Sequence, residues 1–317
     1  ILLLLGLLIL RTVSGFQSFD INELSVLTKQ LAYPIQSLIF ILMAICFIIK
    51  LPSVPFHTWL PDAHVEAPTP VSMLLAGILL KMGCYGILRF GLGFFPEVII
   101  KLAPALAVLG AINILYGAYA ALIQTDLKKI VAYSSISHMG FILLGLASLN
   151  AAGLAGASFQ MFSHGLISAA LFFLVGMIYE RAHTRDIGEF GGLAKVMPQT
   201  FYVFILAAMA NLGLPGLSGF VGESMIFYGA FAGGSIDAVK ISAAVSTLGV
   251  ILTAAYMLWM NQRVFYGETP SKWLTLKDAR KDELFVLSVL LGLSLLYGIY
   301  PQYINSLFEP IFANGIG

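Results

Sequence analysis

Residues 50–64 read Lys50-Leu-Pro-Ser-Val-Pro-Phe-His-Thr-Trp-Leu-Pro-Asp-Ala-His64, and they follow a mainly apolar run that begins at Pro34. Proline lacks a backbone N–H and clashes with the preceding turn, so a helix through this run must end at or before Pro52. Lipid cannot satisfy the freed backbone groups, so such an interruption is tolerated only inside protein or beside water. A lysine at this point is an intramembrane charge, which by default marks an ion or substrate pathway.

The composition is that of a polytopic membrane protein. Of 317 residues, 59% are hydrophobic and 10% are charged, and the mean hydropathy is +0.92. A soluble domain does not need so much apolar surface. The net charge of +1 argues against a nucleic-acid partner. Both cysteines, Cys46 and Cys84, lie in apolar runs without a CxxC pair, and no P-loop or GxGxxG occurs, so we expect no metal site and no cofactor in this chain.

The apolar segments predict an all-α architecture with two interrupted helices. The run 1–10 is shorter than the roughly 20 residues that a span needs, so we expect the chain to be truncated inside a helix. A polar connection, 11–30, should lead to the first interrupted helix, with halves at 34–50 and 56–64. Further spans are predicted at 69–89, 103–124, 130–150, 158–179, 242–260 and 284–300, with a second interrupted segment at 200–231.

The second interruption is Asn-Leu-Gly-Leu-Pro-Gly-Leu-Ser-Gly-Phe-Val-Gly-Glu, residues 211–223. Four glycines and a proline within this stretch cannot sustain a regular helix. The two interruptions lie five segments apart, so their helices should run in opposite directions, which is typical of inverted-repeat transporters. We therefore predict one transmembrane domain over 1–317, with the remainder of a first five-helix repeat at 1–91, a second repeat at 98–267, and a C-terminal helix and tail at 283–317.

Loop charges predict the orientation. One side of the predicted membrane carries ten basic residues and the other carries five. The basic residues of the first side are Lys128, Lys129, Arg181, Arg185, Lys195, Arg263, Lys272, Lys277, Arg280 and Lys281, and those of the second are Arg11, Lys29, Arg89, Lys101 and Lys240. The positive-inside rule places the first side in the cytoplasm or its organellar equivalent.

Five ionisable residues are predicted at depth in the membrane: Lys50, Lys81, His138, His164 and Glu223. A lysine in mid-span costs roughly 2.5–3.5 kcal/mol on insertion scales, and Lys81 is too far from a helix end to reach the interface. A single buried histidine is often a satisfied core residue, but two on adjacent helices beside lysines favour a proton relay. Glu223 is interpreted as a protonation site or as the partner of a buried cation.

A further group, His57, Asp62, His64 and Glu66, shows no helical spacing suited to metal ligands. We interpret this group as a cap at the membrane interface, with Trp59 as an aromatic anchor.

Several motifs together resemble the antiporter-like membrane subunits of respiratory complex I, over nearly the whole chain. They are residues 50–64, Ala67-Pro-Thr-Pro-Val-Ser72, Leu79-Leu-Lys-Met-Gly83, Gln124-Thr-Asp-Leu-Lys-Lys129, Ala132-Tyr-Ser-Ser-Ile-Ser-His-Met-Gly140 and Gly213-Leu-Pro-Gly216. Within that family, Lys81 and a glutamate at 223 resemble the chain M (subunit 4) type, because sister subunits and Mrp-type antiporters usually carry lysine at the latter position.

The resemblance implies a central hydrophilic axis that conducts protons. On that pattern Lys50 is the central lysine of the first half, Lys81 the connecting lysine, His138 and His164 the link, and Glu223 the end of the second half. It implies a glutamate partner for Lys50 on an upstream helix, neighbouring antiporter-like subunits as partners, and NADH, FMN, iron–sulfur clusters and quinone in other subunits. It implies an integral membrane protein, for which we expect a prokaryotic plasma membrane rather than an organellar inner membrane or a thylakoid. An Mrp-type Na⁺/H⁺ antiporter subunit and a membrane-bound hydrogenase subunit are the alternative functions.

Overall fold

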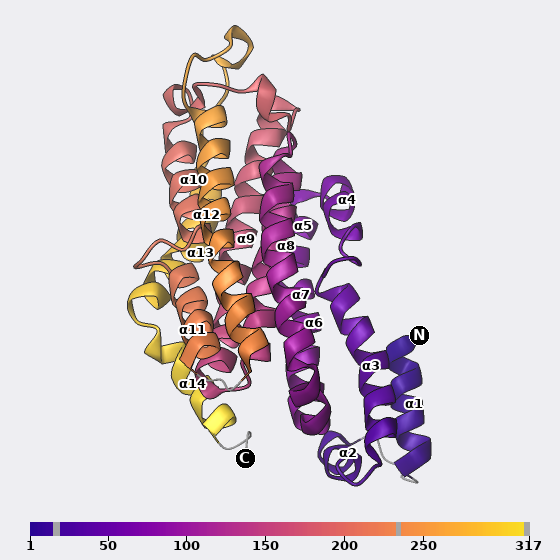
Figure 1. The fold of residues 1–317 in the computed structure, drawn as a ribbon. Coiled ribbons are helices and arrows are strands. Elements are labelled where there is room, and N and C mark those ends of the chain that lie inside the picture. Colours follow the sequence, from indigo (N-terminus) through magenta and orange to yellow (C-terminus); the bar gives the residue numbers. More distant parts are fainter. Residues whose placement is uncertain (15–19, 233–235, 314–317) are drawn as a thin grey trace.

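The computed structural model describes residues 1–14, 20–232 and 236–313, which fold into helices joined by loops (Figure 1). Seven segments of these residues are long and apolar enough to cross a membrane. The predicted all-α polytopic architecture is thereby confirmed, and the chain is an integral, multi-pass membrane protein.

The first part of the chain contains one interrupted span and one continuous span. It comprises α1 (Leu2–Ser14), α2 (Ile21–Thr28), α3 (Tyr33–Lys50) and α4 (Trp59–Glu66), followed by α5 (Thr69–Leu74), a π-helical turn at Leu75–Leu79, α6 (Leu80–Gly86) and a second π-helical stretch at Ile87–Leu92. The sequence did not predict α2, which lies in the connection expected to be only polar loop. Nor did it predict the π-helical turns, which are rare and occur frequently at functional sites.

The second part of the chain comprises α7 (Pro96–Leu122), α8 (Leu127–Ala147), α9 (Ala151–Ala182), α10 (Pro198–Asn211), α11 (Ser218–Ala232), α12 (Asp237–Phe265), α13 (Lys281–Ile299) and α14 (Gln302–Ala313). Among them, α7, α9 and α12 are longer than the spans that the hydropathy predicts. The core lies around α8, where 94% of the apolar window is buried, whereas the corresponding share for α13 is 22%. A helix that is buried on all sides is surrounded by other helices, so α8 forms the centre of the bundle.

The first interruption is stabilised by polar groups from inside the protein. The amide oxygen of Asn113 on α7 accepts hydrogen bonds from the Val54 N–H at 2.8 Å and from the Ser53 hydroxyl at 3.2 Å. The Trp59 indole N–H donates to the Ile49 carbonyl at 3.0 Å. These contacts satisfy backbone groups that the break removes from the helical ladder, which is the condition for irregular backbone at membrane depth.

The second interruption, between α10 and α11, depends on glycine. Gly213 and Gly216 have φ values of +77° and +96°, which a side chain would strain. A Cβ at Gly213 would also lie 3.0 Å from a carboxylate oxygen of Glu223. The break therefore leaves room for this carboxylate to fold back over the chain.

The two interrupted helices run in opposite directions. In Figure 1 the chain rises from α3 to α4 and descends from α10 to α11, and both breaks flank the central helices α8 and α9. This arrangement confirms the antiporter-like fold with two oppositely oriented broken helices. The division into repeats at 1–91 and 98–267 stays a prediction.

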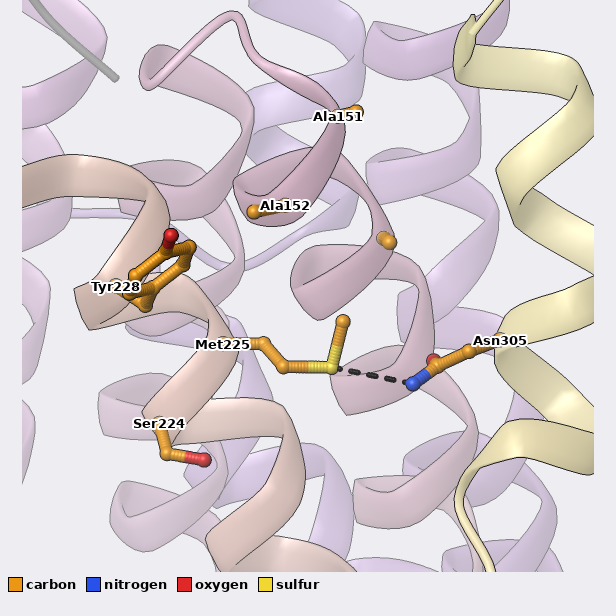
Figure 2. A pocket seen from close by; sticks show the side chains of 7 residues that line it. Ala151, Ala152, Ser224, Met225, Tyr228 and Asn305 are labelled. Carbon is orange, nitrogen blue, oxygen red and sulfur yellow. Dashed lines mark hydrogen bonds between the residues drawn. The ribbon is translucent and has the colours of Figure 1, made fainter. Parts of the chain in front are cut away.

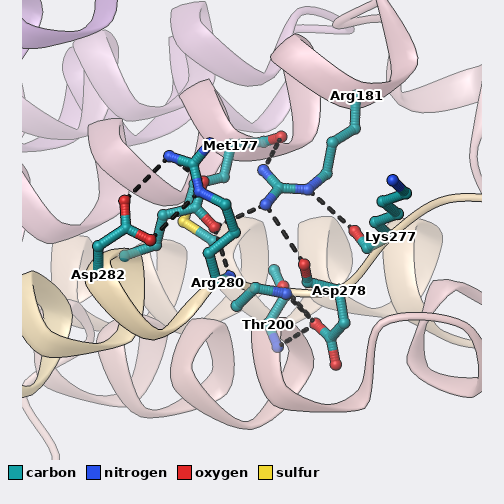
Figure 3. A network of polar contacts seen from close by, with 9 residues as sticks. Met177, Arg181, Thr200, Lys277, Asp278, Arg280 and Asp282 are labelled. Atoms are coloured by element: carbon teal, nitrogen blue, oxygen red, sulfur yellow. Dashed lines mark hydrogen bonds and ion pairs between the residues drawn. The ribbon is translucent and has the colours of Figure 1, made fainter.

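A network of polar contacts ties the loop before α13 to the end of α9 (Figure 3). The Arg181 guanidinium pairs with Glu283 at 2.6 Å and donates to the backbone carbonyls of Lys277 and Asp278 at 2.9 and 3.3 Å. Glu283 is 2% exposed, so its charge depends on this partner. The network therefore fixes where α13 begins relative to α9.

Asp278 extends this network to the start of α10. Its carboxylate accepts the N–H groups of Gln199 at 2.8 Å and Thr200 at 3.1 Å, and the Thr200 hydroxyl at 2.8 Å. Burial alone would raise the pKa of Asp278, but the hydrogen bonds from Gln199, Ala279 and Thr200 outweigh it and lower the pKa below the usual value. Because the folded-state pKa is depressed, this stabilisation is present at neutral pH and is lost as the pH falls through the folded-state pKa.

Replacing Arg181 with methionine is expected to destabilise the fold, because it removes the closer and more buried of the two cations that contact the buried Glu283 carboxylate. Breaking a buried pair typically costs about 3–5 kcal/mol. Thermal unfolding in detergent should show a clearly lower melting temperature for Arg181→Met. Arg280→Met is the matched control, because this guanidinium also reaches Glu283, at 3.5 Å, yet its side chain is 66% exposed. Equal melting temperatures for both variants would contradict a structural role for the Arg181 pair.

Candidate functional site

Lys81 and His164 form the closest contact between ionisable groups in the membrane interior. Lys81 on α6 lies with Nζ 2.7 Å from Nδ1 of His164 on α9. The same ammonium donates to the Ala76 carbonyl, which belongs to the π-helical turn Leu75–Leu79. His164 is 2% exposed. A hydrogen bond of this length between an ammonium and an imidazole nitrogen is a direct route for proton transfer.

Two glycines allow this contact. A Cβ on Gly165, the neighbour of His164, would lie 3.0 Å from the Gly77 carbonyl oxygen, so the backbones of the two helices touch there. Larger side chains would separate the helices and with them Lys81 and His164. The geometry of the site therefore depends on one small residue on each side of the contact. One is Gly77, four positions before Lys81, and the other is Gly165, next to His164.

His138 and Glu223 form a second contact. Nδ1 of His138 on α8 lies 3.3 Å from Oε1 of Glu223 on α11, and the two residues are 2% and 7% exposed. The Gln160 side-chain amide approaches the same imidazole nitrogen at 3.5 Å. Close packing of α11 on α9, where a Cβ at Gly222 would collide with Gln160, holds Glu223 in this position.

The two histidines connect these contacts into one row. Their ring centroids are 5.3 Å apart with an interplanar angle of 51°, so the row runs Lys81–His164–His138–Glu223. A void between the rings, lined also by Gln160 and Asn211, has no room for a water-sized sphere. His138 Nε2 and Gln160 Oε1 have no hydrogen-bond partner within the described residues. Proton transfer between the two histidines therefore needs a ring rotation or a wider void.

Lys50 lies near this row but outside the contacts just described. It is half-buried at the end of α3, and it makes no ion pair with a carboxylate of the described residues. A Cβ on Gly83 would lie 2.6 Å from the Phe47 carbonyl oxygen and 2.8 Å from the Leu51 nitrogen. The end of α3 that carries Lys50 thus packs directly on α6, two residues from Lys81. The partner carboxylate of Lys50 stays a prediction.

The interpretation of His57, Asp62, His64 and Glu66 as an interfacial cap is wrong for the two histidines, whereas Asp62 and Glu66 are exposed. His57 and His64 are 5% and 0% exposed, and both ring nitrogens of each have no hydrogen-bond partner among the described residues. His64 stacks on Phe172 with centroids 4.1 Å apart, and His57 packs edge-on to Tyr116 at 4.8 Å. The half-helix α4 folds back onto α8, which the sequence alone could not show.

Neutral polar groups, which the sequence did not predict as part of the site, support the second break. The Asn211 amide, at the end of α10, donates to the Ser134 hydroxyl at 3.0 Å, and the Tyr256 hydroxyl donates to the same oxygen at 2.7 Å. All three residues are buried. Their signal in the sequence is weak, because an isolated Asn, Ser or Tyr in an apolar span is common.

Two cavities differ in their relation to the row. One of about 680 Å³, between α9, α11 and α14, is lined by small and apolar side chains together with Ser224, Tyr228 and Asn305 (Figure 2). None of the five predicted site residues lines it. A second, of about 440 Å³, is lined by Lys81, Tyr85, Arg89 and Phe162 among others, so Lys81 borders an open cavity.

Interrupted helices of opposite direction, with ionisable side chains meeting between them, define the class of antiporter-like membrane proteins. Comparison with known proteins gives the same class and also identifies the family to which the chain belongs. The chain belongs to the NADH:quinone oxidoreductase/Mrp antiporter transmembrane family, whose family profile matches residues 1–253.

Curated relatives come from cyanobacteria. NAD(P)H-quinone oxidoreductase chain 4 1 of Synechococcus elongatus is 49% identical over 297 residues, which is 92% of this chain and 55% of the relative. The corresponding protein of Nostoc sp. is 46% identical over 298 residues, again 55% of its length. The chain thus spans a little over half of the curated relatives that it matches.

Solved structures agree on the fold. A chain of respiratory complex I from Thermus thermophilus is 32% identical, with a TM-score of 0.90 over 100% of this chain and 66% of that one. A chain of the Mrp complex from Dietzia sp. is 23% identical with a TM-score of 0.88, covering 99% of this chain and 65% of that one, and this likeness concerns the fold alone.

Proposed function

We propose that the chain is a proton-translocating membrane subunit of an NADH:quinone oxidoreductase of the complex I type. The observation that carries this proposal is the row Lys81–His164–His138–Glu223, in which a half-buried lysine and three buried ionisable groups, from four helices, meet side by side. Each member can bind and release a proton, and a buried ionisable residue in a membrane protein is a functional candidate by default. The row begins on α6, which packs on the end of the first interrupted helix, and it ends on α11, which follows the second interruption.

Proton transfer along the row follows from ordinary acid–base chemistry. Lys81 donates to a neutral His164, and an imidazole that gains a proton on one nitrogen can release another from its second nitrogen. His138 exchanges protons with Glu223 directly. The gap between the histidines separates the Lys81–His164 contact from the His138–Glu223 contact. A change in charge near Lys81 or Lys50 would therefore alter proton transfer within the first pair before it alters transfer within the second.

The chain's own residues do not account for electron transfer, so we assign the redox reaction to partner subunits. NADH, FMN, iron–sulfur clusters and quinone would be bound there, and neighbouring antiporter-like subunits would contact this chain laterally. The names of the cyanobacterial and Thermus thermophilus relatives support this placement. We place the complex in a prokaryotic plasma membrane.

The test is proton uptake by vesicles that contain the purified intact complex. We expect uptake only when NADH and a quinone are both supplied, unchanged when sodium is replaced by potassium. Mass spectrometry of the same preparation should identify the redox subunits and further antiporter-like subunits. Sodium-dependent pH changes without a redox donor would instead favour an Mrp-type antiporter, and co-purification with a nickel–iron protein would favour a membrane-bound hydrogenase.

A further inference from the structure

A polar pocket of about 540 Å³ lies at the end of α12, away from the row of ionisable residues. Its side chains include Trp259, Gln262 and Arg263 from the last turns of α12 and Tyr266 and Glu268 just beyond, while Gly191 contributes backbone from the loop between α9 and α10. A hydrogen bond from the Gly192 N–H to the Tyr266 carbonyl, at 2.9 Å, joins the two segments that form its walls. The pocket is thus part of the folded loop structure.

Arg263 differs from the other arginines on this side of the protein. Arg181, Arg185 and Arg280 each pair with a carboxylate, at 2.6, 3.1 and 3.1 Å. The Arg263 guanidinium is exposed and lies 5.5 Å from the Trp259 ring centroid, with no carboxylate of the described residues in ion-pair contact. An arginine held by an aromatic ring but left without an anion is suited to bind an external one.

The pocket lies at the depth of lipid headgroups. The 29 residues of α12 extend about 43 Å, which exceeds the roughly 30 Å hydrocarbon core and matches a bilayer with its headgroups. Arg263 is in the last turn, and Trp259 one turn earlier has the position of an interfacial aromatic residue. This is also the side with the larger number of basic residues, which faces the leaflet richer in anionic lipid.

We propose that this pocket binds the headgroup of an anionic phospholipid, with the phosphate at Arg263 and headgroup hydroxyls at Glu268 and Gln262. Guanidinium binds a phosphate diester through paired charge-assisted hydrogen bonds. Ionised Glu268 can only accept hydrogen bonds, so it favours hydroxyl groups and disfavours a second negative charge. The chemistry therefore selects a singly charged, hydroxylated headgroup such as phosphatidylglycerol over phosphatidic acid. This site does not depend on the proposed proton translocation.

The test is lipid retention by the intact, delipidated membrane complex in detergent, measured by native mass spectrometry after titration with defined lipids. We expect phosphatidylglycerol to bind this chain more tightly than phosphatidic acid or phosphatidylcholine, and Arg263→Gln to weaken that binding about tenfold. Arg280→Gln, which removes an exposed arginine on the same side that is already paired, is the matched control. Glu268→Gln should reduce the preference for phosphatidylglycerol over phosphatidic acid.

Two outcomes would overturn the proposal. Equal phosphatidylglycerol binding by the unsubstituted protein, Arg263→Gln and Arg280→Gln would show that the pocket holds no anionic lipid. Equally tight binding of soluble glycerol phosphate would show that the anion comes from solution rather than from the membrane. Melting temperatures of the variants, which we expect to be unchanged because Arg263 is exposed, separate loss of binding from loss of fold.

Discussion

Replacing Lys81 with methionine is expected to reduce quinone-coupled proton translocation about tenfold or more, while the complex still assembles. The substitution removes the ammonium that lies 2.7 Å from His164 and leaves that histidine without its proton-exchanging neighbour. Loss of one positioned acid–base group typically lowers a rate by about 10²–10⁴-fold, with parallel routes retaining part of it. Assembly should persist, because Lys81 is half-buried and an apolar side chain of similar length removes the cost of a charge in the membrane interior.

The measurement is dye-reported acidification of vesicles that contain the complete complex, alongside the rate of NADH oxidation. Lys81→Arg separates two roles of the residue, because arginine keeps the positive charge but does not release its proton. If Lys81 acts by exchanging protons, Lys81→Arg should fail as Lys81→Met does. Lys240→Met, near the start of α12, is the control for loss of a membrane-helix lysine. Normal pumping by Lys81→Met would refute the role of the row.

The interrupted helices could be predicted from the sequence because proline and glycine act locally. Pro52 and Pro55 lack the backbone N–H that a helix needs and follow directly after the end of α3, and Gly213 and Gly216 adopt positive φ values that other residues avoid. The polar groups that make these breaks tolerable could not be predicted in the same way. Asn113 accepts a hydrogen bond from the Val54 N–H, which lies 59 residues away in the chain, so its role depends on how α7 packs against the first interruption.

The members of the site were predictable, but their contacts were not. An ionisable residue in an apolar span is visible in the sequence, and Lys81, His138, His164 and Glu223, which meet in the row, were predicted in that way. Lys50 was predicted on the same ground but lies outside the contacts of the row, and its role stays a prediction. The order of the row depends on where helices touch, and that is set by small residues such as Gly165 and Gly222. The gap between the two histidines, which divides the row into two pairs, has no signal in the sequence.

Replacing Glu223 with glutamine is expected to lower proton translocation severalfold without loss of folding, because glutamine keeps the shape of the side chain but does not bind and release protons at this position. The carboxylate is 3.3 Å from Nδ1 of His138 and folds over Gly213, so an amide of equal length can occupy the same space. One positioned acid–base group typically contributes about 10²–10⁴-fold to a proton-transfer rate, and parallel routes that retain part of the rate reduce the observed loss.

Glu223→Asp tests whether distance as well as titration matters. Aspartate retains the carboxylate but is one methylene shorter, so its oxygen should no longer reach His138 within hydrogen-bond distance. We expect its pumping rate in vesicles to lie between those of the unsubstituted complex and Glu223→Gln. NADH oxidation measured in the presence of an uncoupler should be nearly equal in all three, because the redox reaction lies elsewhere. Full coupled pumping by Glu223→Gln would place the end of the row at another residue, since a glutamine there interrupts every route through the carboxylate.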